Sequence, residues 1–89
     1  MKPIQLTKSF RKSYSLRIKT SSAIEAKFKD RLEIFKQNPL DERLRAHKLK
    51  GALSHLRSFS ITGDVRLIYE EYVDRYVFLD VGTHAQVYK

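Results

Sequence analysis

LRSFSITGDVRLIYEEYVDRYVFLDVGTHAQVY, residues 56–88, is the stretch that decides the fold. Three runs rich in Val, Ile, Phe and Tyr lie within it: LRSFSI, VRLIYEEY and YVFLDV. The segments TGD and VDR, which carry the turn-forming residues Gly and Asp, separate these runs. Because β-branched and aromatic residues favour strands, this pattern predicts an antiparallel meander of three strands.

The alternation of side chains along the last two strands indicates how the sheet is covered. The residues expected to share one face are Val65, Leu67 and Tyr69 in the second strand and Val77, Leu79 and Val81 in the third. Neither strand has a fully polar face. We therefore expect helices on one face of the sheet and an open groove of aromatic and charged side chains on the other.

Two amphipathic helices are predicted in the first half of the chain. Their apolar stripes are Phe10, Tyr14 and Ile18 in the first helix, and Ile24, Phe28, Leu32 and Phe35 in the second. Residues at this spacing lie on one side of a helix. Thr7 or Ser9 can cap the first helix, and Ser22 with Glu25 fits a capping box for the second.

The remaining segments complete a single α+β domain over residues 1–89. A short strand is predicted at residues 3–6, and Asn38-Pro39 ends the second helix because proline disfavours a helical residue before it. The short connection around Thr20 predicts an antiparallel helical hairpin, which can cover the sheet. Residues 40–55 show little periodicity, with a helical turn expected at 41–45 and a bend at Gly51.

The charge of the chain favours a polyanionic partner. Eighteen Lys and Arg against ten Asp and Glu give a net charge of +8. Such a domain binds nucleic acid because each neutralised phosphate releases counterions. We therefore favour nucleic acid as the partner over a membrane surface, and over the alternative that the charge only solvates the protein. There is no cysteine, which fits a reducing cytosol. Lacking a signal peptide and any apolar run of ~20 residues, the chain is expected to be soluble and cytoplasmic.

RNA strand cleavage is a reaction that the available side chains support without a cofactor. RNA supplies its own nucleophile, the 2′-hydroxyl, so the protein must remove its proton, stabilise the phosphorane and protonate the leaving 5′-oxygen. Histidine and aspartate transfer protons, arginine fits phosphate oxygens, and tyrosine stacks on unpaired bases. His47, His55 and His84 lack the spacing of a metal site, and no glycine-rich phosphate loop is present. We therefore expect neither a metal nor a cofactor.

Several segments carry a resemblance to a known family: HKLKG (47–51), LRSFSITGDVRLIY (56–69), YVFLDVGTH (76–84) and the near-terminal VY. With them the chain resembles the RelE/ParE superfamily of type II toxin–antitoxin toxins, and most of all its YafQ-like branch. This implies a β-α-α-β-β-β order, with an antiparallel sheet covered on one face by a helical hairpin. It also implies cleavage of mRNA in the ribosomal A site, inhibition by an antitoxin, and no metal.

Site residues follow from the resemblance by position. Those expected to be catalytic are His47, Asp64, His84 and Arg66, and those expected to contact RNA are Arg57, Lys48, Lys50 and Tyr88. Lys48 and Lys50 are included because the loop is dense in charge beside Gly51. The YafQ-like branch has a histidine where this chain has Ser60, so the assignment of general base and general acid stays open. His84 can act with Asp64, with Arg57 or Arg66 compensating for the missing group.

Three functions remain compatible with these patterns. The first is a ribosome-dependent mRNA endonuclease, the second a ParE-like toxin that poisons DNA gyrase, and the third a basic module without catalysis. ParE-like toxins generally lack a catalytic histidine near the C-terminus, so His47 and His84 favour the nuclease. The expected partners are an acidic antitoxin, the ribosome and mRNA, with DNA reached only through the antitoxin complex and no membrane involved.

Overall fold

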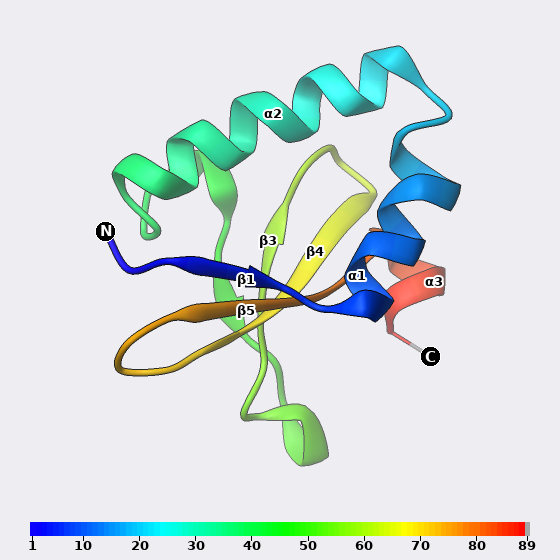
Figure 1. Cartoon of the computed structure of the whole chain (residues 1–89). Helices are drawn as coiled ribbons and strands as arrows, with labels where there is room; N and C mark the ends of the chain where they lie inside the picture. Colours follow the sequence, from blue (N-terminus) through cyan, green and yellow to red (C-terminus); the bar gives the residue numbers. More distant parts are fainter. Residues whose placement is uncertain (89) are drawn as a thin grey trace.

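A five-stranded sheet with the order β1-β5-β4-β3-β2 forms the centre of the fold (Figure 1). The computed structural model describes residues 1–88. The strands are β1 (Ile4–Leu6), β2 (His47–Lys48), β3 (Arg57–Ser60), β4 (Val65–Glu71) and β5 (Tyr76–Thr83). The α+β class and the antiparallel meander of β3, β4 and β5 are confirmed. Because β1 runs parallel to β5, the sheet as a whole is mixed rather than antiparallel.

The predicted alternation of β5 is wrong beyond its midpoint because the strand contains a register shift. Phe78 and Asp80 pair with consecutive residues of β4, so Leu79 between them has no partner there. One extra residue reverses the facing of every side chain beyond it. Val81 consequently joins the core cluster with Phe78 instead of sharing a face with Leu79.

Helix α1 (Lys8–Ser13) begins at Thr7, one of the two predicted caps. The Thr7 Oγ1 accepts a hydrogen bond from the backbone N–H of Phe10 at 3.0 Å. The helix continues as a π-helical segment, η1 (Tyr14–Ile18), which carries the rest of the predicted apolar stripe. The first predicted helix is therefore found at the expected position, but it changes from an α-helix to a π-helix at Tyr14.

Helix α2 (Ser22–Gln37) is capped by Ser21, so the predicted capping box at Ser22 is wrong. The backbone of Ser21 is extended and its hydroxyl accepts an N–H from the first turn. The Glu25 carboxylate, expected to complete the box, accepts the hydroxyl of Tyr14 at 2.5 Å and thereby joins α2 to η1. The helix ends at Asn38, as predicted.

Aromatic rings fill the space between the helices and the sheet. Phe35 of α2 is fully buried, with its ring centroid 4.9 Å from those of Phe59 and Tyr76. Phe10 and Phe28 lie 6.2 Å apart and extend the cluster toward α1. The apolar stripes predicted for the two helices thus cover one face of the sheet and leave the other face for the groove described below.

The segment between α2 and β3 contains three short elements. The predicted helical turn is present as η2 (Glu42–Leu44), which the buried Leu44 anchors in the core. Strand β2, which the sequence did not predict, pairs with β3. The turn η3 (Gly51–Leu53) begins at Gly51, whose φ of +65° is a left-handed conformation that glycine adopts readily. A final turn, α3 (His84–Val87), follows β5.

Candidate active site

A groove of about 270 Å³ lies where β2, β4 and α3 meet. Its lining residues are His47, Lys48, Leu49, Lys50, Arg66, His84 and Tyr88. We call it the His47–His84 groove. Six of the eight predicted site residues line it, and three of its side chains are Lys or Arg with no carboxylate among them. A groove with this lining attracts anions and places two imidazoles beside them.

His47 reaches the groove from the sheet edge, where it pairs with Ser58 of β3. Its Nδ1 lies 3.1 Å from the backbone carbonyl oxygen of Arg45. A carbonyl only accepts hydrogen bonds, so Nδ1 of the neutral ring carries the proton and Nε2 is left as a proton acceptor. The exposed ring of His47 is thereby set in one tautomer with its basic nitrogen free.

Arg66 enters from the middle of the sheet. In the register of β3 and β4 it faces Ser60, and its Nη1 donates to the Ser60 Oγ at 2.9 Å. This contact fixes the half-buried guanidinium while leaving other N–H groups to the groove. A planar guanidinium held in this way can bind phosphate oxygens in two places at once.

His84 and Tyr88 belong to α3 and its end. Their ring centroids lie 4.3 Å apart, and the Tyr88 hydroxyl donates to the Ser58 Oγ at 2.7 Å. The turn begins with a capping box formed by Thr83 and Gln86. Tyr88 is therefore tied to β3 on one side and packed against His84 on the other.

Asp64 contacts α3 without lining the groove. Its backbone oxygen accepts the His84 N–H at 3.1 Å, and its Oδ1 lies 3.4 Å from the same nitrogen. Thr62 holds the turn by accepting N–H groups of Asp64 and Val65 through its Oγ1, at 3.3 and 3.0 Å. The carboxylate therefore sits at the start of the element that carries His84.

Arg57 is the second predicted site residue outside the groove lining. It pairs with Tyr69 across β3 and β4, and its Nε donates to the Tyr69 hydroxyl at 3.4 Å. Burial raises the pKa of Tyr69, so this hydroxyl stays protonated at neutral pH. The structure thus places Arg57 beside a core tyrosine.

Sequence analysis missed Ser58, and it noted Ser60 only as the place of a family histidine, not as a residue that holds a groove side chain. Ser58 accepts from Tyr88, and Ser60 accepts from Arg66. Both are buried on the side of β3 opposite Phe59, and the alternation in RSFS was the available signal. Small hydroxyls at these positions satisfy groove side chains without filling the space above the sheet.

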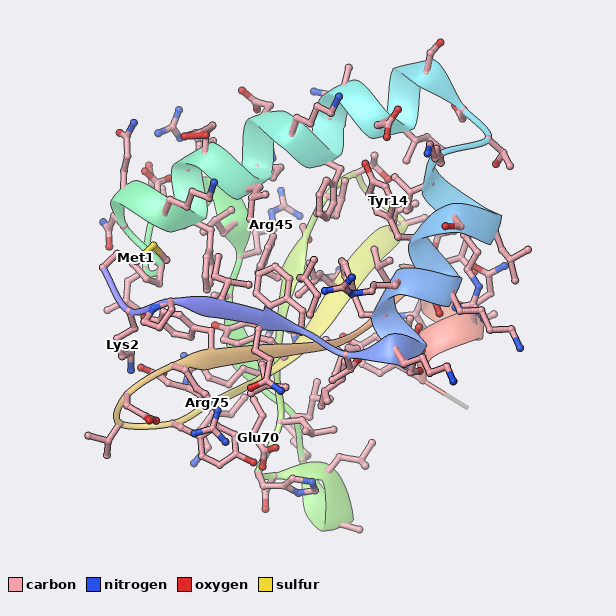
Figure 2. The ribbon with its side chains drawn as sticks, viewed as in Figure 1. Met1, Lys2, Tyr14, Arg45, Glu70 and Arg75 are labelled. Carbon is pink, nitrogen blue, oxygen red and sulfur yellow. The ribbon has the colours of Figure 1, made fainter. Side chains whose placement is uncertain are left out.

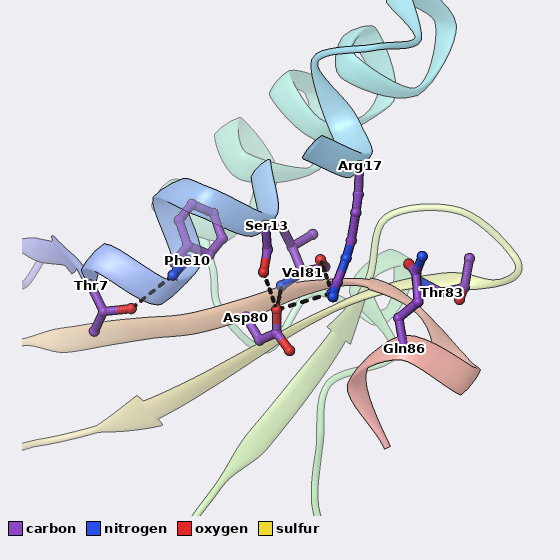
Figure 3. Close-up of polar contacts among 8 residues, drawn as sticks. All are labelled: Thr7, Phe10, Ser13, Arg17, Asp80, Val81, Thr83 and Gln86. Carbon is purple, nitrogen blue, oxygen red and sulfur yellow. Dashed lines mark hydrogen bonds and ion pairs between the residues drawn. The ribbon is translucent and has the colours of Figure 1, made fainter. Parts of the chain in front are cut away.

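A polar network beneath α1 supports the C-terminal end of β5 (Figure 3). Asp80 accepts the Ser13 hydroxyl at 2.6 Å and pairs with the Arg17 Nη1 at 3.3 Å. The same Nη1 donates to the Val81 carbonyl at 3.2 Å. These contacts fix the strand immediately before the turn that carries His84.

Replacing Gly82 with alanine is expected to loosen α3. The added Cβ would lie 2.6 Å from the Gln86 Oε1 and 2.8 Å from the Arg17 Nη1. Both atoms end flexible side chains, so they would move aside and lose hydrogen bonds, among them the 2.8 Å bond from the Thr83 N–H to Gln86. We expect a loss of about 1–2 kcal/mol in the free energy of unfolding, measured by urea denaturation.

The matched control for this change is Gly63→Ala, because nothing lies within 4 Å of a Cβ at Gly63. This control should leave stability close to that of the unmodified chain. Equal stability of the two variants would contradict the proposed packing of Gly82 against α3 and Arg17.

In residues 1–88 no cluster of three or more His, Cys, Asp or Glu side chains is placed to hold a metal ion. Within the same residues no helix is long and apolar enough to cross a membrane.

The fold is that of a small toxin of a type II toxin–antitoxin system. A family model described as "Bacterial toxin of type II toxin-antitoxin system, YafQ" matches residues 2–89. The chain therefore belongs to the YafQ toxin family.

Solved structures share this fold. YafQ from E. coli strain BL21(DE3) has a TM-score of 0.82 and 23% identity, with 100% of both chains covered. A copper-bound mutant toxin from Helicobacter pylori has a TM-score of 0.76 and 28% identity over 98% of this chain and 99% of that one. The E. coli DinJ–YafQ toxin–antitoxin complex gives 0.76 and 25% identity, covering 99% and 98%. A search of curated proteins found no match.

Proposed function

We propose that the chain is a ribosome-dependent endoribonuclease that cuts mRNA in the A site by attack of the 2′-hydroxyl. The observation that carries this proposal is the convergence of His47, Arg66, His84 and Tyr88 in one cationic groove. These side chains come from three elements far apart in sequence. They supply the proton transfer, phosphate binding and base stacking that the reaction needs.

The groups divide the reaction as follows. One imidazole takes the proton of the 2′-hydroxyl while its oxygen bonds to phosphorus, and the other protonates the 5′-oxygen as the phosphorus–oxygen bond to it breaks. The free Nε2 of His47 suits the first task, which leaves the second to His84. Arg66 neutralises charge on the phosphorane, and Tyr88 offers its ring to the neighbouring base. Lys48 and Lys50 attract the RNA backbone.

We assign Asp64 a positioning role. Its carboxylate contacts the backbone N–H of His84 and lies outside the groove lining, so we expect it to act by placing α3. Asp64→Asn, which keeps an oxygen acceptor, should retain most of the cleavage rate, whereas Asp64→Ala should lower it. The measurement is the initial rate of cleavage of ribosome-bound mRNA. Equal losses in the two variants would instead assign the carboxylate to proton transfer.

We further propose that the chain works in the cytoplasm without a metal and is inhibited by an acidic antitoxin. E. coli YafQ is found in complex with DinJ, and the charge of +8 on this chain suits an acidic partner. DNA would be reached only through the antitoxin complex. One Helicobacter pylori toxin structure is copper-bound and another is metal-bound, so metal independence has its own test, in which chelator is added to a reaction whose ribosomal magnesium is controlled.

The test of the function is a reconstituted translation reaction with a stalled ribosome of known A-site codon, read by primer extension. Cleavage within that codon, absent from the same mRNA without ribosomes, is the expected result. Intact mRNA would contradict the proposal. A parallel gyrase supercoiling assay would show whether the chain acts instead as a gyrase poison.

A further inference from the structure

A second basic pocket, of about 580 Å³, is lined in part by Ser60, which accepts a hydrogen bond from Arg66 of the His47–His84 groove. It is bounded by Lys27 and Arg31 of α2, by Glu42, Arg43 and Arg45 around η2, and by the end of β3 and the turn after it, residues 60–63. Four of its side chains are Lys or Arg and one is a carboxylate. We call it the Arg45 pocket.

Two of the four cations are already engaged. Arg43 is held by Asp41, with the Nε 3.0 Å from Oδ1 and the Nη2 2.9 Å from Oδ2. Arg31 pairs with Asp30 at 2.6 Å. Lys27 and Arg45 form no ion pair within residues 1–88, so they supply the charge that a ligand can use.

Arg45 connects the two sites through its backbone. Its φ of +50° and ψ of +43° make it the one non-glycine residue with positive φ in residues 1–88. This costly conformation turns the chain out of η2 toward β2. Its carbonyl then meets His47 while its side chain lines the second pocket beneath α2 (Figure 2).

Ser60 makes the second connection. It lines the Arg45 pocket, and its Oγ accepts the hydrogen bond from Arg66, which lines the His47–His84 groove. The two sites are therefore linked through Ser60, whose side chain lines one of them and accepts a hydrogen bond from the arginine of the other. A polymer that places a phosphate against Arg66 has a second cationic surface on the other partner of that hydrogen bond.

We propose that the Arg45 pocket binds the phosphate backbone of the RNA strand beside the nucleotide held in the His47–His84 groove. This rests on the proposed function and extends it from one nucleotide to a track along the strand. Unpaired cations next to a reactive groove suit a continuous polyanion. A separate and more apolar groove, whose lining includes Phe10, Phe28, Leu32 and Phe78, offers an antitoxin helix a surface of the kind that amphipathic helices bind.

The test compares two double variants that remove the same charge. Lys27→Gln with Arg45→Asn strips the pocket, and Asn suits the left-handed backbone at position 45. Lys12→Gln with Lys29→Gln is the control, because both lysines are exposed and neither lines a groove or pocket described above. The probe is a fluorescein-labelled 2′-O-methyl oligouridylate, which cannot be cut through its 2′-oxygen, titrated at a series of potassium chloride concentrations.

The pocket variant should bind more weakly than the control, and its slope of log K against log salt should be shallower by roughly 1.4, since each lost contact with a single strand removes about 0.7. Equal slopes in the two variants would overturn the proposal. So would a pocket variant that binds RNA normally but no longer binds the acidic antitoxin, because the pocket would then be a protein contact.

The proposed function fails separately from this inference. The unmodified chain could cut no mRNA on the ribosome while the pocket variant still shows the shallower slope of log K against log salt. The Arg45 pocket would then bind RNA in a protein that is not a nuclease. If the unmodified chain cuts mRNA while the two double variants bind alike, the nuclease stands and the pocket assignment is wrong.

Discussion

Replacing His84 with alanine is expected to lower the rate of mRNA cleavage by about 10²- to 10⁴-fold, the usual cost of losing a positioned proton-transfer group. The imidazole lines the groove, and its ring centroid lies 4.3 Å from that of Tyr88 with the two planes tilted by 57°. The turn that carries it has its first N–H held by the backbone oxygen of Asp64. No other histidine approaches the groove from α3. The measurement is the single-turnover rate of cleavage on saturating stalled ribosomes, which separates chemistry from binding.

The chain supplies a matched control in His55. This residue is also exposed, but it lies in the turn before β3 and lines no groove or pocket described above. His55→Ala should therefore cleave at nearly the unmodified rate. Antitoxin binding should survive His84→Ala, because a side chain that transfers a proton need not contribute binding energy. Full cleavage activity in His84→Ala would remove this residue from the mechanism.

The meander and the two helical segments could be predicted because each buries one side of a regular repeat. Val65, Leu67 and Tyr69 alternate along β4, and Phe28 and Phe35 lie on one side of α2, so local pattern and tertiary packing agree. A segment can be predicted from sequence when its local pattern and its tertiary packing favour the same structure. The errors fall where tertiary contacts override the local pattern.

Strand β5 and the cap of α2 show how this happens. A period of two cannot reveal that Leu79 is an inserted residue, since the register shift depends on the pairing with β4. Glu25 has the spacing of a capping box, yet Tyr14 of η1 takes its carboxylate. Strand β2 is too short for any periodic signal and exists because β3 offers it an edge.

The candidate site was predictable in its residue types more than in its geometry. The resemblance to a toxin family named most of the residues and the charge of the loop named Lys48 and Lys50, and six of the eight line one groove. The register explains why Arg57 does not. Arg57 pairs with Tyr69, a core residue, whereas Arg66 pairs with Ser60 on the groove side, so the two arginines belong to opposite faces. That distinction follows from alternation within RSFS and VRLIY once the strand pairing is known.

Removing the 2′-hydroxyl of the nucleotide at the cut site is expected to abolish cleavage while leaving binding nearly intact. The proposed reaction has no other nucleophile, because the groove supplies proton transfer and charge but the attacking oxygen comes from the RNA. A single 2′-deoxy substitution removes that oxygen and keeps the phosphates that Arg66, Lys48 and Lys50 would contact. The readouts are primer extension for cleavage and filter retention for toxin bound to the stalled ribosome.

The control is an mRNA that carries the same deoxy substitution one codon upstream. This mRNA should be cut at its A-site codon at the normal rate. With the unmodified RNA, the 5′ fragment should end in a 2′,3′-cyclic phosphate or its hydrolysis product, because the 2′-oxygen bonds to phosphorus as the 5′-oxygen leaves. Efficient cutting of the substituted site would mean that water is the nucleophile. In that case the Nε2 of His47, which is free because Nδ1 bonds to the Arg45 carbonyl, would take a proton from the attacking water. The roles of the two histidines would then have to be assigned again.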